Sequence, residues 1–388
     1  MSQFPVIGII GAGTMGSGIA QVAATAGHNV LIFDNNFEVA NNSIQIIKKS
    51  LNKFVEKNKL SKLESEKIIG RIVLVKSLKE FSNSELIIEA IIENENIKQK
   101  LYSELEKIIS PNCVIATNTS SFSIQKLSEQ LIKRDRFIGM HFFNPPVLME
   151  LVEIIFSSET NSVLPKKIKS LLINWKKVPV IVKDTPGFIV NRIARSFYLE
   201  ALKILEEKIA NIQTIDWAMR EFGKFKMGPF ELMDLIGLDI NYSVSQSVYK
   251  SFQNNPRFKP SELQKKMVSE NQLGRKTGIG FYNYSNGNIQ IEPTKDEKIG
   301  KEIFYRIISM LINEAAFSLE ENIASYEDIE LAMQKGANYP KGLFDWGNEI
   351  GYQNIIAILN KLEFEKTDKR YSACSLLLEL DKNKIKIK

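Results

Sequence analysis

Cysteine and histidine are both scarce in this chain of 388 residues, which holds two of each. Cys113 and Cys374 are too few for a disulfide scaffold and lack the spacing of metal ligands, so we expect no metal site and a reducing, cytoplasmic location. Any chemistry that needs an imidazole must use His28 or His141. His28 lies in the polar turn Ala26–Asn29 and is expected to be exposed and inert, which leaves His141 as the candidate.

Long apolar runs and strong net charge are also missing. No run approaches the roughly 18 apolar residues of a membrane-spanning helix, and the first residues lack the basic start of a signal peptide. We therefore expect no membrane association. The 51 basic and 45 acidic residues leave a net charge of +6, which is too mild to indicate nucleic acid but suits a small polyanionic ligand. A hydrophobic content of 44% excludes a disordered or fibrous chain.

The first 185 residues alternate short β-branched runs with amphipathic stretches. Strands are predicted at Val6–Ile10, Val30–Phe33, Ile72–Val75, Leu86–Ile91, Val114–Thr117, Phe137–Phe143, Leu151–Phe156 and Val178–Val182. Helices are predicted at Met15–Ala26, Val39–Lys57, Asn96–Ile109 and Pro165–Asn174. This alternation predicts a Rossmann-type, doubly wound α/β domain with a mostly parallel sheet over residues 1–185.

Beyond Pro186 the strand pattern nearly vanishes, and Gly187–Arg192 is expected to open a long helix with Pro186 near its first turn. A shift of 114 residues aligns Arg192–Gly237 with Arg306–Gly351 without gaps, and sixteen of 46 positions are identical. Such self-similarity indicates a duplicated unit. We therefore predict two tandem all-α domains, residues 186–284 and 298–388, joined by a linker at Asn283–Glu297.

A glycine-rich turn follows the first predicted strand and opens the first helix. Its residues are Gly11, Ala12, Gly13, Thr14, Met15 and Gly16. In this context the three glycines permit a tight turn, backbone approach to a pyrophosphate and close helix–strand packing, and the helix N-terminus offers N–H groups to phosphate. Asp34 ends the second strand 18 residues after Gly16, where a carboxylate accepts ribose hydroxyls and repels a 2′-phosphate. The pattern predicts NAD rather than NADP.

His141 lies near the end of a predicted strand, at the sheet edge where α/β sites form. Glu153 follows 12 residues later in the next strand, beyond an Asn-Pro-Pro turn. A carboxylate in an apolar strand costs free energy unless it has a partner, and His141 is the obvious one. A carboxylate partner makes an imidazole more basic and fixes its tautomer. The pair is therefore predicted to be a general base that removes a hydroxyl proton while hydride leaves the same carbon.

Several segments of the sequence, taken together and in order, resemble the L-3-hydroxyacyl-CoA dehydrogenases, which include the 3-hydroxybutyryl-CoA dehydrogenases. The matching segments are Glu89–Asn94, Thr117–Ser121, His141–Pro146 with Leu151–Glu153, Asp184–Arg192 and Gly274–Tyr282. The resemblance covers about residues 4–284. The second helical copy resembles the duplicated C-terminal domain of some longer family members.

The resemblance implies a role for individual residues. His141 is the base and Glu153 its orienting partner, while Ser120 bonds the substrate oxygen and Asn191 completes the pocket. The nicotinamide side is formed by Glu93, Lys98, Asn118, Ser120, Asn144 and Lys276, and Asp34 binds the adenine ribose. Coenzyme A is contacted by Ser50, Lys57, Lys98 and Ser120. Ser50 and Lys57 are seven residues apart on one predicted helix and so share a face.

The function implied is reversible, NAD-dependent oxidation of an (S)-3-hydroxyacyl-CoA, short-chain such as 3-hydroxybutyryl-CoA, to the 3-ketoacyl-CoA. Three alternatives stay open: a relative that acts on a free hydroxy acid or sugar acid, a non-enzymatic crystallin-like relative, and a sensor that only binds NAD. Ser50 and Lys57 argue against the first alternative. His141 and Glu153, with the other matched catalytic positions, argue against the non-enzymatic relative.

The second helical copy departs from the first at one informative position. The 114-residue shift maps Asn191 onto Tyr305, so the second copy lacks that polar residue and is predicted to be structural. Each copy has an apolar face that needs a mate. We therefore predict that the two copies pack on each other as a pseudo-dimer within one chain. A monomer is then possible, and a homodimer is not excluded.

Overall fold

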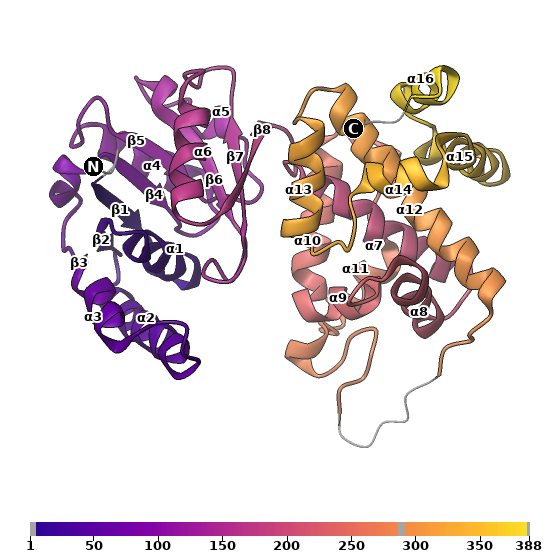
Figure 1. Cartoon of the computed structure of the whole chain (residues 1–388), viewed down its shortest axis with the longest axis horizontal. Helices are drawn as coiled ribbons and strands as arrows, with labels where there is room; N and C mark the ends of the chain where they lie inside the picture. The colour runs from indigo at the N-terminus through magenta and orange to yellow at the C-terminus, as the bar shows by residue number, and fades with distance from the viewer. Residues whose placement is uncertain (1–4, 286–291, 386–388) are drawn as a thin grey trace. The chain divides into compact units, whose positions relative to one another are not determined.

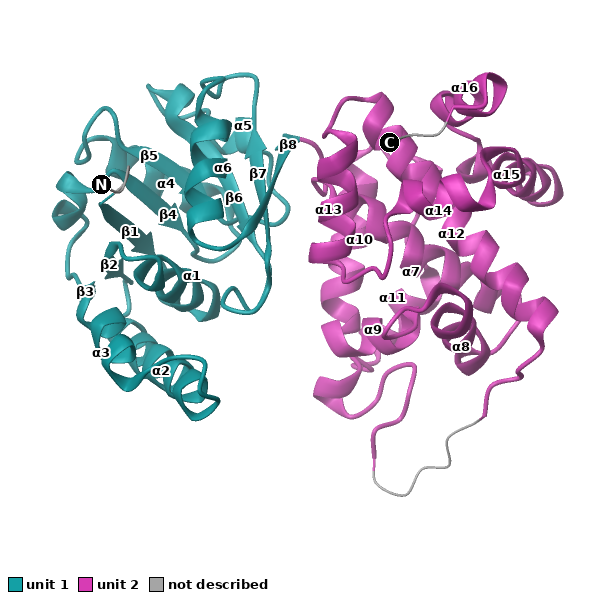
Figure 2. Cartoon of the chain, in the orientation of Figure 1, with its two compact units in different colours: residues 1–184 teal, residues 185–388 magenta. Residues whose placement is uncertain are grey.

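The computed structural model describes residues 5–285 and 292–385. The chain folds into two compact units, Met1–Asp184 and Thr185–Lys388 (Figure 2). The further division of the second unit into two helical domains stays a prediction. Residues 286–291 of the expected linker lie outside the described part of the chain, and the helix that follows begins at Glu297.

The first unit contains an eight-stranded sheet with the order β3-β2-β1-β4-β5-β6-β7-β8 (Figure 1). The strands are β1 (Val6–Ile10), β2 (Asn29–Phe33), β3 (Ile72–Leu74), β4 (Leu86–Glu89), β5 (Val114–Thr117), β6 (Phe137–Phe142), β7 (Leu151–Phe156) and β8 (Val178–Lys183). Neighbouring strands are parallel except β6 and β7, which pair antiparallel. The predicted Rossmann-type sheet is thus confirmed, with each predicted strand in place.

Helices cover both faces of this sheet. They are α1 (Thr14–Thr25), α2 (Phe37–Glu56), α3 (Lys62–Gly70), α4 (Glu95–Glu106), α5 (Ile124–Leu127) and α6 (Leu164–Asn174), with 3-10 turns η1 (Leu78–Asn83) and η2 (Arg134–Arg136). The apolar sides of α1, α2, α3 and α6 pack in one core with alternate strand residues such as Ile9, Ile88 and Met140. Helices α4 and α5 lie on the other face, where Tyr102 of α4 reaches Glu89 of β4 and Ile124 of α5 lies beside Gly139 of β6.

Two expectations for this unit were incomplete or wrong. Helix α3 was not predicted, although Ser61 and Glu64 form a capping box at its start, with Glu64 N–H donating to Ser61 Oγ and Ser61 N–H to Glu64 Oε2. His28 is not exposed: it is 4% accessible, and its Nε2 accepts a hydrogen bond of 2.8 Å from Trp175 Nε1. The turn looks polar in sequence, but Trp175, which follows α6, covers it.

The second unit is helical in all its described elements. The first copy contains α7 (Val190–Glu206), α8 (Ile212–Gly223), α9 (Pro229–Ile236), α10 (Leu238–Ser251), η3 (Pro256–Phe258), α11 (Glu262–Ser269) and η4 (Arg275–Thr277). The second contains α12 (Glu297–Glu320), α13 (Tyr326–Gly336), α14 (Leu343–Ile350), α15 (Tyr352–Lys366), η5 (Lys369–Tyr371) and α16 (Ser375–Asn383). Helix α7 begins at Val190, so Pro186 precedes it, separated by a turn with positive φ at Gly187 and Phe188.

The repeat extends further in the structure than in the aligned sequence. The order α7-α8-α9-α10-η3-α11 recurs as α12-α13-α14-α15-η5-α16. Ser261 Oγ, before α11, donates to Glu206 over 2.6 Å. At positions 114 residues later, Ser375 Oγ, at the start of α16, donates to Glu320. The duplicated unit therefore reaches α11 and α16, where little sequence identity remains.

A buried carboxylate holds the start of the same helix in each copy. Asp216 of α8 accepts hydrogen bonds from the N–H groups of Phe230 (2.9 Å) and Glu231 (3.0 Å) at the start of α9. Its counterpart Glu330 accepts from Phe344 N–H (3.0 Å) at the start of α14. These bonds satisfy N–H groups that a helix start leaves without partners.

The glycine before each of these helices makes room for that carboxylate. A Cβ at Gly228 would lie 2.3 Å from Asp216 Oδ1, and one at Gly342 would lie 1.5 Å from Glu330 Oε2. Both distances are far shorter than atoms in contact allow, so neither position accepts a side chain. This explains why a glycine two residues before a phenylalanine recurs in register, as Gly228 with Phe230 and as Gly342 with Phe344.

The two copies contact each other through reciprocal ion pairs along α7 and α12. Arg192, fully buried, donates to Glu314 (Nε to Oε1, 2.7 Å) and to Glu321 (Nη1 to Oε2, 2.7 Å). The equivalent Arg306 donates in return to the equivalents of these glutamates, Glu200 over 2.6 Å and Glu207 over 2.9 Å. This reciprocity is the pattern of an isologous dimer interface, here formed within one chain.

Candidate active site

The glycine-rich turn lies at the point where the strand order reverses, between β1 and β4. Gly11 has a φ of +98°, and a Cβ there would lie 2.5 Å from Ala90 O of the loop after β4. A Cβ at Gly16 would lie 1.8 Å from Gly11 O, whereas one at Gly13 would meet nothing within 4 Å. The first and third glycines are therefore required by packing. The second leaves open space at the start of α1, which fits the approach of a pyrophosphate to the backbone.

The residues between these glycines complete the turn. Ser17 Oγ donates to Ala12 O (2.9 Å) and Gly13 O (2.8 Å), which braces the turn from α1. Thr14 and Met15 begin that helix, and Gly13 at its N-cap offers no side chain to its N–H groups. Such a helix start is suited to bind an anion.

Asp34 directly follows β2 and bridges two backbone segments. Its Oδ2 accepts from Ala12 N–H over 2.8 Å, and its Oδ1 accepts from Asn36 N–H over 2.9 Å. The carboxylate is thereby held beside the glycine turn, at the position where it accepts ribose hydroxyls in dinucleotide-binding folds. The open glycine, the helix start and this acid together fit NAD.

His141 and Glu153 are direct cross-strand neighbours on β6 and β7. Nδ1 of the imidazole lies 2.6 Å from Oε2 of the carboxylate, and the side chains are 8% and 0% exposed. Because a carboxylate accepts hydrogen bonds, the proton of this bond is carried by Nδ1. The antiparallel hairpin, which includes the cis Asn144–Pro145 bond, brings the two residues together.

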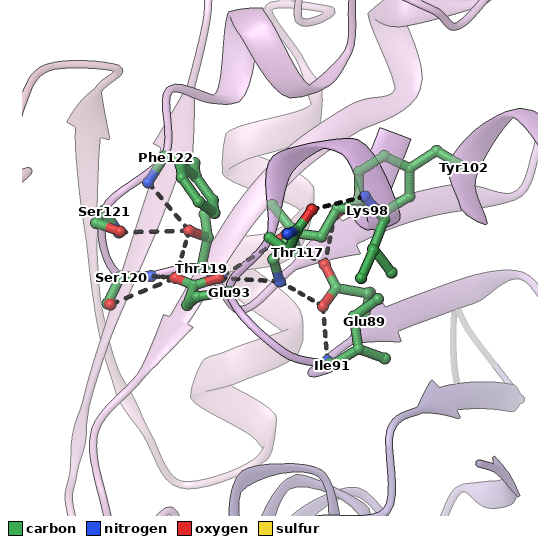
Figure 3. Close-up of polar contacts among 12 residues, drawn as sticks. Glu89, Ile91, Glu93, Lys98, Tyr102, Thr117, Thr119, Ser120, Ser121 and Phe122 are labelled. Atoms are coloured by element: carbon green, nitrogen blue, oxygen red, sulfur yellow. Dashed lines mark hydrogen bonds and ion pairs between the residues drawn. The ribbon is translucent and has the colours of Figure 1, made fainter. Parts of the chain in front are cut away.

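A second buried carboxylate, Glu89, ends β4 on the α4-covered face of the sheet (Figure 3). Its Oε1 accepts from Lys98 Nζ over 2.6 Å and from Ile91 N–H over 2.7 Å. Its Oε2 accepts from Thr117 Oγ1 over 2.8 Å and from the Tyr102 hydroxyl. Burial and the neighbouring Glu89 carboxylate raise the pKa of Tyr102 well above its ordinary value, so the phenol remains a donor.

Lys98 connects Glu89 to the expected nicotinamide-side residue Glu93. Lys98 Nζ lies 3.1 Å from Glu93 Oε2. The other oxygen, Glu93 Oε1, accepts from Thr119 Oγ1 (2.7 Å), Ser120 N–H (2.9 Å) and Ser120 Oγ (3.4 Å). Figure 3 shows this continuous chain of contacts from Glu89 to Ser120. The structure therefore brings Glu93, Lys98 and Ser120 together.

Two further predicted residues lie around the ends of β5 and β6. Asn118 follows β5, and its Oδ1 accepts from Phe142 N–H over 2.8 Å, which ties β5 to β6 beside His141. Asn144 is exposed in the loop between β6 and β7. Lys177 fixes that loop, because its Nζ donates to Pro146 O (2.5 Å) and to Met149 O (2.8 Å). Burial lowers the pKa of Lys177 to about 8.

The expected coenzyme A contacts lie on α2. Ser50 is half-buried in that helix, and Lys57 is exposed at its C-cap, one residue beyond the helix end at Glu56. Lys57 N–H still bonds to Lys53 O (3.3 Å), so the backbone continues the helical path and the two side chains remain seven residues apart on it. No group of three or more His, Cys, Asp or Glu side chains within residues 5–285 and 292–385 is placed to hold a metal ion.

Models of known protein families match nearly the whole chain. Residues 6–185 match the 3-hydroxyacyl-CoA dehydrogenase NAD-binding domain. Residues 187–284 and 303–386 match the 3-hydroxyacyl-CoA dehydrogenase C-terminal domain, in two segments that correspond to the two helical copies. The chain belongs to the 3-hydroxyacyl-CoA dehydrogenase family. It is therefore an NAD-dependent dehydrogenase, as the sequence predicts.

Relatives within the 3-hydroxyacyl-CoA dehydrogenase family include short and long forms. The chain is 32% identical to a 3-hydroxyadipyl-CoA dehydrogenase of Escherichia coli K12, with 97% of each covered. It is 38% identical to a 3-hydroxybutyryl-CoA dehydrogenase of Clostridioides difficile, over 72% of this chain and 99% of that one. A solved structure of an E. coli K12 3-hydroxybutyryl-CoA dehydrogenase is 31% identical, with a TM-score of 0.92 over 98% of this chain and 99% of that one.

Two of the residues that the dehydrogenase family implies lie in the helical unit. Asn191 is the second residue of α7, half-buried, and its carbonyl accepts from Arg195 Nε over 3.0 Å. Lys276, in η4, pairs with both oxygens of Asp239 over 2.6 Å. The roles of both residues stay predictions.

Sequence reasoning missed Glu89, Tyr102, Thr117 and Lys177. The signal for Glu89 was present, because it is a carboxylate at the end of the apolar run Leu86–Ile88, as Glu153 is within β7. Thr117 opens the matching segment Thr117–Ser121 but was given no role, whereas Tyr102 and Lys177 had no comparable signal. A tyrosine on an amphipathic helix or a lysine after a helix is usually a surface or core residue.

Proposed function

We propose that this protein oxidises (S)-3-hydroxyacyl-CoA to 3-ketoacyl-CoA with NAD, reversibly, with His141 as the general base. The observation that carries the proposal is the buried His141–Glu153 pair, held at 2.6 Å near the carboxyl end of β6. The glycine turn after β1 and Asp34 after β2 lie at the same edge of the parallel strands. A base and a dinucleotide turn on one edge suit removal of a hydroxyl proton together with a hydride from the carbon that carries that hydroxyl.

The chain supplies the proton transfer in this mechanism. Glu153 holds His141 Nδ1–H, so the ring accepts the proton of the substrate hydroxyl at Nε2. The carboxylate stabilises the imidazolium that results. NAD, when bound, takes the hydride. In the reverse direction the imidazolium returns its proton to the carbonyl oxygen.

The remaining residues orient the substrate and the cofactor in this proposal. Ser120 Oγ hydrogen-bonds the reacting oxygen, and Asn191 is assigned to the substrate pocket by the family resemblance. Glu93, Lys98, Asn118, Asn144 and Lys276 line the nicotinamide side, and Asp34 binds the adenine ribose. Ser50 and Lys57 of α2 contact coenzyme A, together with Lys98 and Ser120. The chain works in the cytoplasm, and the intrachain pairing of its helical copies makes a monomer possible.

A short acyl chain, such as that of 3-hydroxybutyryl-CoA, is the favoured substrate. Support comes from the E. coli structure with that name, which matches both helical copies with a TM-score of 0.92. A second candidate is 3-hydroxyadipyl-CoA, because the E. coli relative with that name is also covered over 97% of its length. The two candidates differ in acyl length and in the terminal carboxylate.

The test is NADH production with purified protein and a series of (S)-3-hydroxyacyl-CoA thioesters of four to sixteen carbons, with 3-hydroxyadipyl-CoA included. Free 3-hydroxybutyrate is the control for the need for coenzyme A. The highest kcat/KM on a four-carbon thioester supports the proposal, and a maximum on the adipyl thioester supports the second candidate. Turnover of the free acid alone, or of no compound, contradicts both.

A further inference from the structure

The order of the strands in the sheet indicates where each half of a dinucleotide binds. The order reverses between β1 and β4, and a dinucleotide lies across such a point. Asp34, the acid suited to the adenine ribose, follows β2 on one side of β1. The nicotinamide half must therefore lie on the other side, over the ends of β4, β5 and β6. Glu93 and Ser120 follow β4 and β5 there, and His141 is the penultimate residue of β6.

The charges at that end form a three-membered cluster: Glu89, Lys98 and Glu93. Glu89 and Lys98 are 0% and 1% exposed, whereas the side chain of Glu93 is 39% exposed. Lys98 Nζ is closer to Glu89 (2.6 Å) than to Glu93 (3.1 Å). The formal charges of the three side chains at neutral pH sum to −1. Because the buried pair cancels, the net charge resides on the exposed member, Glu93.

Oxidised and reduced nicotinamide differ by one charge: the oxidised ring is a cation and the reduced ring is neutral. A net negative charge beside the ring stabilises the cation and leaves the neutral ring almost unaffected. Without Glu89, Lys98 would neutralise Glu93 instead, and the cluster would lose this discrimination. The position of Glu89 thus matters even though it lies beneath the surface of the site.

We propose that Glu89 is a positioning residue that neutralises Lys98, so that Glu93 keeps the negative charge that favours NAD⁺ over NADH. This inference rests on the proposed function, since it requires that nicotinamide binds beside Glu93. Glu89 acts only through Lys98 and touches neither substrate nor cofactor. Thr117 and Tyr102 orient the Glu89 carboxylate through neutral hydrogen bonds.

The test measures the dissociation constants of NAD⁺ and NADH separately, by calorimetry and by NADH fluorescence, and compares their ratio among variants. In Glu89→Gln the cluster charge changes from −1 to 0, so the ratio of the NAD⁺ to the NADH constant should rise by about tenfold. In the matched control Thr117→Val, a hydrogen bond to the same carboxylate is lost without a change of charge, and the ratio should stay at the wild-type value. In Glu89→Gln/Lys98→Met the net charge returns to −1, and the ratio should return with it.

A role in folding alone predicts a different outcome. If Glu89→Gln weakens both dinucleotides by the same factor, or if the double variant departs further from the wild-type ratio, the proposal is wrong. Should Glu89→Gln fail to fold, the double variant, which leaves no unpaired charge at the buried pair, is compared with Glu93→Gln. The first should then show the wild-type ratio and the second the tenfold rise, and equal ratios would overturn the proposal.

Failure of the inference is distinguishable from failure of the proposed function. If the wild-type protein binds neither dinucleotide, or does not oxidise any hydroxyacyl-CoA, the proposed function fails. If the wild-type protein does both but the ratio is insensitive to Glu89→Gln, only the inference fails.

Discussion

Two carboxylates, Glu89 and Glu153, are fully buried in strands that are otherwise apolar, and each is surrounded by donors or by an imidazole. A buried charge that loses its partner destabilises the fold by about 3–5 kcal/mol. Each of these carboxylates therefore depends on its partner. Both carboxylates hold another side chain: Glu153 holds His141, and Glu89 holds Lys98. At the scale of single residues, two buried acids therefore orient two buried basic side chains of the site, His141 and Lys98.

Removal of the base should abolish most turnover without loss of the fold. His141→Ala and Glu153→Gln are expected to lower kcat by about 10²–10⁴-fold, the usual effect of losing a general base. NAD binding, measured by calorimetry, should change little, because the glycine turn and Asp34 are unaltered. Substitution of His28 is the comparison for substitution of His141, because His28 is the other imidazole of the chain and accepts a hydrogen bond from Trp175. Near-normal turnover in His141→Ala would exclude the mechanism.

Cofactor choice should depend on the charge of Asp34. The wild-type protein is expected to show a much higher kcat/KM with NAD than with NADP, because the carboxylate repels a 2′-phosphate. Asp34→Asn keeps the shape of the side chain but removes its charge. It should lower the ratio of the kcat/KM with NAD to the kcat/KM with NADP by at least about tenfold. Steady-state kinetics with both cofactors measure the effect. Equal or better use of NADP by the wild-type protein would contradict the role of Asp34.

At the scale of elements, the two helical copies share one arrangement that joins neighbouring helices. Each copy starts its third helix, α9 or α14, on a buried carboxylate from the preceding helix, and a glycine makes the room. Burial raises the pKa of Asp216 to about 7 and that of Glu330 to about 7, against the lowering effect of the hydrogen bonds they accept. The start of each helix is therefore linked to proton binding.

Stability should fall as the pH rises through the range that separates the folded and unfolded pKa of Asp216. In the unfolded chain this carboxyl loses its proton near pH 4, whereas in the folded chain it keeps the proton up to about pH 7. Between these values the unfolded state binds fewer protons, so the free energy of unfolding decreases with pH. The difference between wild type and Asp216→Asn, from urea unfolding at several pH values, should fall between pH 4 and 7 and level off above. Glu330→Gln should show the same sign, and a flat difference would contradict the raised pKa.

At the scale of the whole chain, the duplication lets a self-complementary surface of the first helical copy pack against the equivalent surface of the second copy. Arg192, Glu200 and Glu207 recur as Arg306, Glu314 and Glu321, and each arginine pairs with the glutamates of the other set. Phe225 and its equivalent Tyr339 contact each other at a centroid distance of 5.0 Å. Contact between equivalent residues marks the axis of a two-fold arrangement. The second copy thus covers a face of the first.

Removal of the second copy should expose that face and cause association. A chain truncated after Tyr284 leaves Arg192 without Glu314 and Glu321, but two such chains could pair Arg192 with Glu200 and Glu207 of each other. Sedimentation should therefore show dimers or larger species, and Arg192→Glu should weaken this association. Turnover should persist in the soluble fraction, since His141 and Glu153 are retained. A truncated chain that stays monomeric and stable would refute the explanation.

Much of the fold and of the site follows from local patterns. Strands β1 and β7 run from Val6 to Ile10 and from Leu151 to Phe156, as predicted, because their β-branched runs are bounded by turn residues. The His141–Glu153 pair follows from the cost of an unpartnered carboxylate in a strand. Helix α3 was not predicted although Ser61 and Glu64 form a capping box, and the true start of α7 was missed because the positive φ angles at Gly187 and Phe188 delay the helix to Val190.

The sequence by itself determined the strands of the sheet, the dinucleotide turn, the pairing of His141 with Glu153 and the duplication. Each depends on residues close together in the chain or on a repeat that can be counted. Only the tertiary structure decided that His28 is buried against Trp175, that Glu89 is joined to Ser120 through Lys98 and Glu93, and that Arg192 and Arg306 exchange glutamates. These contacts join residues on different elements, and the free energy that fixes them comes from burial, which no single segment can specify.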